Sequence, residues 1–281
     1  MRQLMQPGPV HPKRIDSIPG KPHRLHFALT PGATLNAALT APLVAAGFQS
    51  ATVTFQAADL DPFHYVVPSP ANDAFHVAWF SAPRAPIGTC RIERANATFG
   101  WVNGKPFVHC HAVWSEPDGR RRGGHILPHE TILAATAEAT GWGFMNVRIE
   151  AAADAETNFP LFQPSGIPLR DASGIVARIK PNQDILTAIE TIASTYRVAD
   201  AVVRGSLGSL IGARFAGGGQ VDDHATEVLV REGCICNGQA ALDMLVVDMR
   251  GMVHEGWLQH GQNPVCITFE VVLEAVAPPA G

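Results

Sequence analysis

Apolar positions along the chain predict the same series of elements twice. In each series, alternating apolar residues are followed by an apolar spacing of three to four positions and then by a short apolar run. Alternation is typical of a half-buried strand, and the wider spacing is typical of an amphipathic helix. The first series occupies residues 25–29, 35–43 and 51–55, and the second occupies residues 175–179, 185–193 and 200–203.

Two turn signals repeat in the same order. Asn103-Gly104 and Asn237-Gly238 each separate two apolar runs, and this dipeptide favours the tight turn of a β-hairpin. Asp118-Gly119 and Arg250-Gly251 mark a second turn in each half, with a further glycine five positions later. A helix, two turns and a trailing glycine in one order indicate a tandem repeat.

We therefore expect an α/β (α+β) protein made of two copies of a small domain. Each copy would have a mixed, mostly antiparallel sheet and one main helix. The predicted domains span residues 23–164 and 172–277, joined at 164–171, where two prolines and a glycine disfavour regular structure. The proline-rich residues 1–22 are expected to be loosely attached.

Three local signals add detail to this prediction. Pro42 lies inside the first helical pattern and is expected to kink or split it. The segment 205–209, Gly-Ser-Leu-Gly-Ser, lacks the spacing of a phosphate or dinucleotide loop and is predicted to be a turn. Only the first copy contains a segment rich in proline and aromatics, residues 59–86. This insertion either folds over the core or lines a pocket.

A histidine cluster is the strongest chemical signal. Along a strand over 107–114, His109 and His111 would share one face and Cys110 would point to the other. A turn centred on Asp118 would place His111 opposite His125, since both lie seven positions from it. Directly opposed residues have Cβ atoms about 5 Å apart. We therefore expect three imidazoles to converge.

Three converging imidazoles are typical of a metal site, and zinc is the metal we expect. Neutral imidazole is a good zinc ligand, and three protein ligands leave a fourth position open for water or substrate. His76 and His129 are possible further ligands. The alternative interpretation is that these histidines are ordinary hydrogen-bonded residues.

The second copy lacks the cluster. With the turns at Gly119 and Gly251 aligned, the three histidines correspond to other residue types, which are Ala241, Asp243 and Trp257. A histidine needed for the fold would tend to recur in both copies. The second copy is therefore predicted to be structural, or to have its function elsewhere.

Composition and charge favour a protein of packed domains and count against a dedicated nucleic-acid-binding or membrane-spanning protein. Apolar residues make up 46% and charged residues 16%, which favours packed domains. The net charge of −4 gives no bulk attraction to nucleic acid, and the only basic run is Arg120–Arg122. No signal peptide and no apolar run of membrane-spanning length is visible.

The five cysteines are an odd number in a long chain, which favours reduced thiols and a cytoplasmic location. Cys234 and Cys236 share one face of a predicted strand. They would either stay reduced or bind a metal together with Cys266 or His254.

The combined pattern resembles the plants-and-prokaryotes-conserved (PPC) domain, which occurs alone in prokaryotes and with AT-hooks in plant nuclear proteins. The matching motifs are the strand, Pro-Gly or Pro-Asn, helix and strand, followed by His109-Cys110-His111 and Gly123-Gly124-His125. The resemblance implies a largely antiparallel sheet and trimeric assembly. It also implies that 131–140, whose alanines are typical of a helix, is a strand. Prokaryotic members with three histidines look like zinc-binding proteins, which points to His109, His111 and His125.

The leading hypothesis is a cytoplasmic, oligomeric metal-binding protein whose open site binds or transforms a small anionic or carbonyl-bearing ligand. Whether it is an enzyme is left open, and Glu130 and Glu138 are the candidate general bases. One alternative is a DNA-associated regulator acting through Arg120–Arg122, although the Arg-Gly-Arg-Pro core of an AT-hook is absent. The other alternative is a structural oligomer scaffold.

Overall fold

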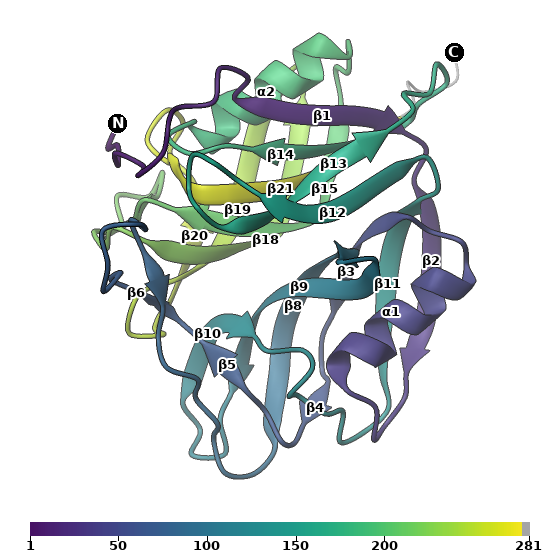
Figure 1. Ribbon diagram of the computed structural model, residues 1–281, viewed down its shortest axis with the longest axis vertical. Helices are drawn as coiled ribbons and strands as arrows, with labels where there is room; N and C mark the ends of the chain where they lie inside the picture. Colours follow the sequence, from purple (N-terminus) through teal and green to yellow (C-terminus); the bar gives the residue numbers. More distant parts are fainter. Residues whose placement is uncertain (277–281) are drawn as a thin grey trace.

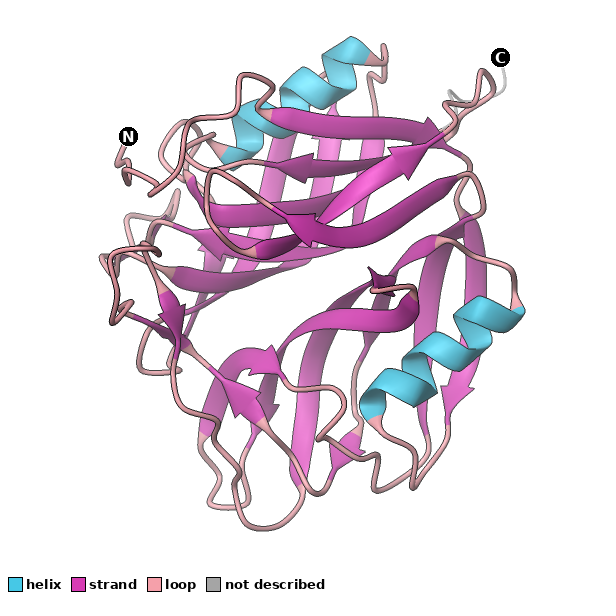
Figure 2. Cartoon of the chain, in the orientation of Figure 1, coloured by secondary structure: helices cyan, strands magenta, loops and turns pink. Residues whose placement is uncertain are grey.

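Two large, mostly antiparallel sheets with one helix on each make up most of the protein, and two two-stranded sheets lie beside them (Figures 1 and 2). The computed structural model describes residues 1–276, so the predicted limit of the second domain at 277 lies outside the described residues. The only parallel pairing found within 1–276 is one residue pair between two strands of the first sheet. The expectation of mostly antiparallel sheets with one helix each agrees with this architecture, whereas the α/β label describes it poorly.

The first sheet has the path β2-β11-β3-β8-β9-β10-β5, with three further strands beside it. Its long strands are β2 (His23–Leu29), β3 (Ser50–Phe55), β8 (Cys90–Val102), β9 (Lys105–Ser115), β10 (Arg121–Ile126), β11 (Ala137–Phe144), β12 (Val147–Ala153) and β13 (Pro160–Gly166). Its helix is α1 (Leu35–Ala45). The insertion forms the short strands β4 (Asp59–Leu60), β5 (Tyr65–Val66), β6 (Pro68–Ser69) and β7 (Trp79–Phe80).

The second sheet has the order β1-β14-β21-β15-β18-β19-β20. Its elements are β1 (Ile15–Gly20), β14 (Gly174–Ile179), α2 (Ile185–Thr195), β15 (Ala201–Leu210), β18 (Thr226–Cys236), β19 (Gln239–Val247), β20 (Val253–Trp257) and β21 (Val265–Ala275). The short strands β16 (Ala213–Arg214) and β17 (Gln220–Val221) pair with each other. Apart from β1 and β5, the two sheets use six strands in the same relative order, so the repeat read from the turns is also a repeat of topology.

The helices begin at equivalent caps. The side chains of Thr34 and Asp184 accept hydrogen bonds from backbone N–H groups three residues later, which satisfies one free donor at each helix start. The helix α1 is continuous through Pro42, so the expected split is wrong. The proline removes one hydrogen bond near the C-terminal end, and the Ala46 N–H still bonds to the Pro42 carbonyl.

Each sheet buries both of its faces. One face packs against the sheet's own helix, and the opposite face packs against the other sheet. On β9, Cys110 belongs to the core under α1, whereas the adjacent positions His109 and His111 contact the second sheet. Val113 packs there with Leu207 of β15. The alternation of a strand therefore places the histidines between the two sheets.

A bulge in β15 connects the sheets. Gly205 and Ser206 have φ values of 53° and 73°, so the segment predicted as a turn is an irregularity within a strand. A Cβ on Gly205 would lie 1.9 Å from the Thr52 hydroxyl oxygen, and only glycine fits this approach. The buried Asn96 side-chain amide lies 2.8–2.9 Å from the carbonyl oxygens of Gly205, Ser206 and Val230.

An Asn96→Ala variant is expected to lose stability because it leaves these carbonyls without their donor. A buried polar group left unsatisfied costs about 1–3 kcal/mol. Urea denaturation should therefore show a lower free energy of unfolding, while Asn72→Ala, in an exposed loop, should change it little. Equal stability of the two variants would contradict this role of Asn96.

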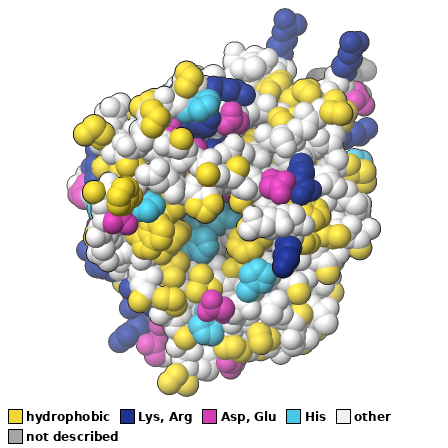
Figure 3. Space-filling view, viewed as in Figure 1, with side chains coloured by type: hydrophobic (Ala, Val, Ile, Leu, Met, Phe, Trp, Pro, Cys, Tyr) yellow, Lys and Arg dark blue, Asp and Glu magenta, His cyan; other side chains and the backbone are white. Residues whose placement is uncertain are grey.

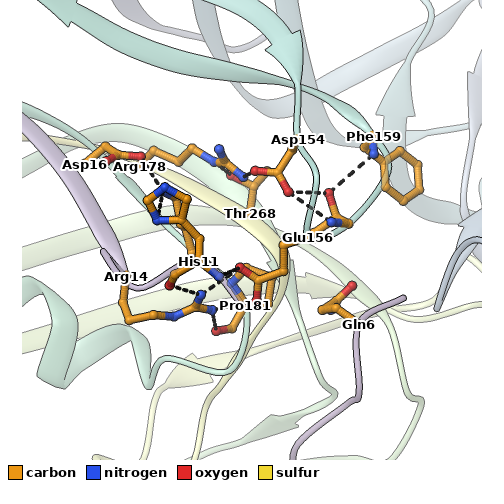
Figure 4. A network of polar contacts seen from close by, with 12 residues as sticks. Gln6, His11, Arg14, Asp16, Asp154, Glu156, Phe159, Arg178, Pro181 and Thr268 are labelled. Atoms are coloured by element: carbon orange, nitrogen blue, oxygen red, sulfur yellow. Dashed lines mark hydrogen bonds and ion pairs between the residues drawn. The ribbon is translucent and has the colours of Figure 1, made fainter. Parts of the chain in front are cut away.

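The N-terminal segment is firmly attached, so the expectation of loose attachment is wrong. β1 is the edge strand of the second sheet, paired with β14 over its whole length. Arg14 forms two hydrogen bonds with Glu156, at 2.7 and 2.9 Å (Figure 4). Lys180 pairs with Asp16 at 2.9 Å. The high proline content of residues 1–22 predicted an irregular segment, although residues 15–20 form a strand that pairs with β14 of the second copy.

Two further boundaries differ from the prediction. Pro164 and Gly166 lie within β13, because an edge strand tolerates a residue without an N–H donor. The segment 131–140 contains no helix, and its regular strand starts only at Ala137. Neither helix within residues 1–276 is long and apolar enough to cross a membrane.

Candidate metal centre

The three predicted histidines converge. β9 and β10 pair with His111 directly opposite His125, the register expected from a turn centred on Asp118. The ring centroids lie 4.7 Å apart for His109 and His111, 4.9 Å for His109 and His125, and 5.3 Å for His111 and His125. One nitrogen from each ring lies within 4.8 Å of the other two.

Hydrogen bonds from the second sheet orient two of these rings. His109 Nδ1 lies 3.0 Å from Glu270 Oε1, and His111 Nδ1 lies 3.1 Å from the Val228 carbonyl oxygen. Both partners accept, so we assign the ring proton of each neutral histidine to Nδ1. A carboxylate or carbonyl that holds the distal nitrogen of an imidazole is the usual support of a metal ligand.

This tautomer assignment leaves two lone pairs facing each other. His109 Nε2 and His111 Nε2 are 3.0 Å apart, and neither carries a proton when both Nδ1 atoms donate. Such an approach needs a cation, either a proton or a metal ion. Two ligands of a tetrahedral zinc ion are about 3.3 Å apart, given Zn–N distances near 2.0–2.1 Å. The spacing of these two nitrogen atoms is therefore close to that of two ligands of one metal ion.

Burial disfavours the proton as that cation. Burial lowers the pKa of His111 well below 6.5, and the nearby charges of His109 and His125 lower it further by smaller amounts. Burial likewise lowers the pKa of His125 well below 6.5, and the charge of His109 adds a smaller effect in the same direction. His125 Nδ1 is buried and has no hydrogen-bond partner among residues 1–276. Neutral rings with free nitrogen lone pairs are the form in which imidazole binds a metal.

The second copy lines the site and supplies hydrogen-bond acceptors to two of its histidines, a contribution that the prediction for this copy did not include. Glu270 on β21 and Glu227 on β18 line the same cavity as the histidines. At the positions equivalent to His111 and His125, Asp243 and Trp257 also pair across two strands. The alignment of the copies was thus correct, but it did not reveal that one copy covers the histidines of the other.

A cavity of about 410 Å³ lies beside the histidines, between the sheets. Histidine atoms are visible in a hollow on this face, beside hydrophobic groups (Figure 3). The aromatic residues along the cavity are Trp79, Phe80, Phe107, Phe159 and Phe162. Both interpretations of the insertion apply, because Phe63 and Tyr65 are buried in the core whereas Trp79 and Phe80 line the cavity.

The other predicted ligands and bases lie elsewhere. His76 pairs with Asp73, and neither it nor His129 belongs to the group of possible metal ligands within 1–276. Glu138 pairs with His26 near the opposite edge of the first sheet. Glu130 does not line the cavity; its carbonyl accepts from His64. The carboxyl groups that line the cavity with the histidines are Glu227 on β18 and Glu270 on β21, and neither residue belongs to a recognisable sequence motif.

The cysteines form no second metal site within the described residues. The Sγ atoms of Cys234 and Cys236 are 3.7 Å apart, while Cys266 is buried beside the cavity and His254 pairs with Asp248.

The basic run is largely neutralised within the chain. Arg121 pairs with Glu93 at 2.6 Å and with Glu255 at 2.9 Å, and Arg120 pairs with Asp118. These ion pairs compensate the charges of two of the three arginines that would contact nucleic acid in the alternative hypothesis.

Comparison with known proteins finds no matching family model and no matching curated protein. Solved structures similar to this chain include a metal-containing protein from Archaeoglobus fulgidus, with 17% identity and a TM-score of 0.42 over 52% of this chain and 96% of that one. They also include a PPC protein from Pyrococcus horikoshii, with 16% identity and a TM-score of 0.40 over 52% and 94%. A candidate DNA-binding protein from Ralstonia eutropha has 17% identity and a TM-score of 0.38 over 53% and 97%. The similar structures thus include a protein of the family that the motifs resemble, and each aligns with about half of this chain.

Proposed function

We propose that the protein binds one divalent metal ion, zinc by preference, through His109, His111 and His125. The facing Nε2 atoms of His109 and His111 carry this proposal, because their Nδ1 atoms are held by acceptors and a cation must separate the lone pairs. The borderline-soft zinc ion is well matched to three imidazoles.

The site is open, so we infer a role in binding or transforming a small ligand. Cys110 points to the opposite face of β9, and Glu270 is engaged with His109 Nδ1. A fourth ligand would therefore come from the cavity, as at zinc sites that bind or activate a substrate. A closed structural site would have four protein ligands instead.

Elemental analysis of untagged protein, saturated with zinc and then desalted, tests the site. Wild-type protein should retain about one zinc per chain, and His111→Ala should retain almost none. His129→Ala is the matched control, because this histidine contacts Phe107 of the cavity wall but lies outside the cluster. Absence of zinc in the wild type, or unchanged zinc in His111→Ala, would refute the proposal.

A Glu270→Gln variant should bind the metal more weakly without losing the site. Replacing a partner that orients a histidine ligand lowers metal affinity about 10- to 100-fold. Competition with a chelator of known zinc affinity would measure the difference. Glu274→Gln serves as the control, because Glu274 lies on the same strand but pairs with Arg204. Equal zinc affinities of the two variants would remove Glu270 from the site.

A further inference from the structure

Two carboxyl groups in the cavity lack complete hydrogen bonding. Glu227 Oε2 and Glu270 Oε2 are both buried and have no partner among residues 1–276. The other polar side chains of the cavity already take part in hydrogen bonds within the second sheet: Ser209 and Thr226 with the backbone, and Thr268 with Arg178. A bound molecule would therefore meet the histidines and these two carboxyl groups as the free polar groups.

Glu227 differs from Glu270 in its surroundings. Glu270 is bonded to His109, whereas no hydrogen bond or ion pair of the Glu227 side chain is found within the described residues. Glu227 is only 5% exposed, and burial raises its pKa well above 4.5. Its neutral form carries an O–H donor. A buried donor without an acceptor is costly, so a ligand oxygen at this position would be stabilising.

The remainder of the cavity is apolar and reaches the histidines directly. Trp79 stacks on Phe159 with ring centroids 5.1 Å apart. The ring centroids of Phe80 and His125 are 5.3 Å apart. No lysine or arginine is among the described residues that line the cavity. This lining favours a hydrocarbon or aromatic body and disfavours a phosphorylated ligand, which would need basic partners.

We propose that the cavity binds an apolar monocarboxylate, with one carboxylate oxygen on the histidine-bound metal and the other accepting a hydrogen bond from Glu227. This inference rests on the proposed metal site, which holds the first oxygen. A divalent ion and the Glu270 carboxylate leave one positive charge, which a single carboxylate neutralises. The cavity of about 410 Å³ lies within the size range of small-molecule sites.

Cobalt-loaded full-length protein allows a direct test, because the visible spectrum of cobalt(II) changes when a ligand enters its coordination sphere. We expect acetate, butyrate and hexanoate to bind with increasing affinity. Each buried methylene adds about 0.8 kcal/mol, so two methylenes should tighten binding about fifteenfold. Trp79→Ala should weaken hexanoate binding but leave acetate binding unchanged. Equal affinities along the series, with cobalt bound, would overturn this inference alone.

Variants of Glu227 test the head-group contact. Glu227→Gln retains a donor and should bind hexanoate within about threefold of wild type, whereas Glu227→Leu should bind it more than about tenfold more weakly. Melting temperature and cobalt stoichiometry report whether each variant is folded and loaded. Wild-type affinity in Glu227→Leu would overturn the contact. Failure of wild-type protein to take up cobalt would instead refute the metal site itself.

Discussion

An Asp154→Ala variant is expected to lose about 3–5 kcal/mol of unfolding free energy, because it leaves a buried arginine without its counter-ion. Arg178 Nη2 lies 2.7 Å from Asp154 Oδ2, and the two side chains are 1% and 8% exposed (Figure 4). Asp154 also accepts hydrogen bonds from the backbone and the hydroxyl of Thr157. The Arg178 Nη1 atom is buried and has no hydrogen-bond partner among residues 1–276.

Urea denaturation at pH 7 would measure this loss. Asp171→Ala is a suitable control, since Asp171 is an exposed carboxylate in the loop between the two sheets. A decrease of less than about 1 kcal/mol in the free energy of unfolding of Asp154→Ala would contradict the prediction, because exposed ion pairs already contribute that much. An Asp154→Leu, Arg178→Met double variant should lose less than Asp154→Ala, because it removes both charges together.

The same pair predicts sensitivity to acid. Burial raises the pKa of Asp154, but the hydrogen bond and charge of Arg178 outweigh it, and the pKa lies below 3.8. A carboxylate with a lowered folded-state pKa stabilises the protein fully above its unfolded value, and this stabilisation is lost as the pH falls through the folded value. The stability difference between wild type and Asp154→Ala should therefore shrink below pH 4.

The sequence predicted what depends on local pattern. Alternation along β9 set the face of His109 and His111, and the position of Asp118 set the register to His125. Helix and turn signals were repeated closely enough to align the copies, and the strand order of the two sheets agrees with that alignment. These features could be read because a strand has a period of two and a short turn determines which residues face each other.

Contacts between the sheets could not be predicted in this way. Glu227 and Glu270 line one cavity with the histidines only because the second sheet packs on the face of the first sheet that is opposite α1. The periodicity of a strand predicts on which face a side chain lies, but not which element of the protein packs against that face. Gly205 was misread for the same reason, since its positive φ serves a close approach to Thr52 across the interface.

The two copies divide the site between them. The first copy supplies the three imidazoles, and the second supplies the Val228 carbonyl and the Glu270 carboxylate that orient two of them. The second copy therefore needs no histidines of its own for this site, provided that it keeps these acceptors. The difference in sequence between the copies thus accompanies different contributions to one cluster.

Replacing Glu227 by glutamine is expected to stabilise the protein above pH 4.5, and increasingly so as the pH rises. Burial raises the pKa of Glu227 well above its ordinary value of 4.5. In wild-type protein the unfolded chain releases this proton above pH 4.5, while the folded chain retains it. Unfolding then becomes easier by up to about 1.4 kcal/mol per pH unit, until the folded-state pKa is passed. Glutamine does not titrate and escapes this loss.

Denaturant unfolding of metal-free wild type and Glu227→Gln between pH 4 and 8 would measure the effect. The two curves should run parallel below pH 4.5 and diverge above it, whereas Glu232→Gln, an exposed acid on the same strand, should follow wild type throughout. Parallel curves for Glu227→Gln over the whole range would mean that Glu227 is ionised in the folded protein. It could then not donate to a ligand carboxylate, so the stability measurement tests the proposed head-group contact without any ligand.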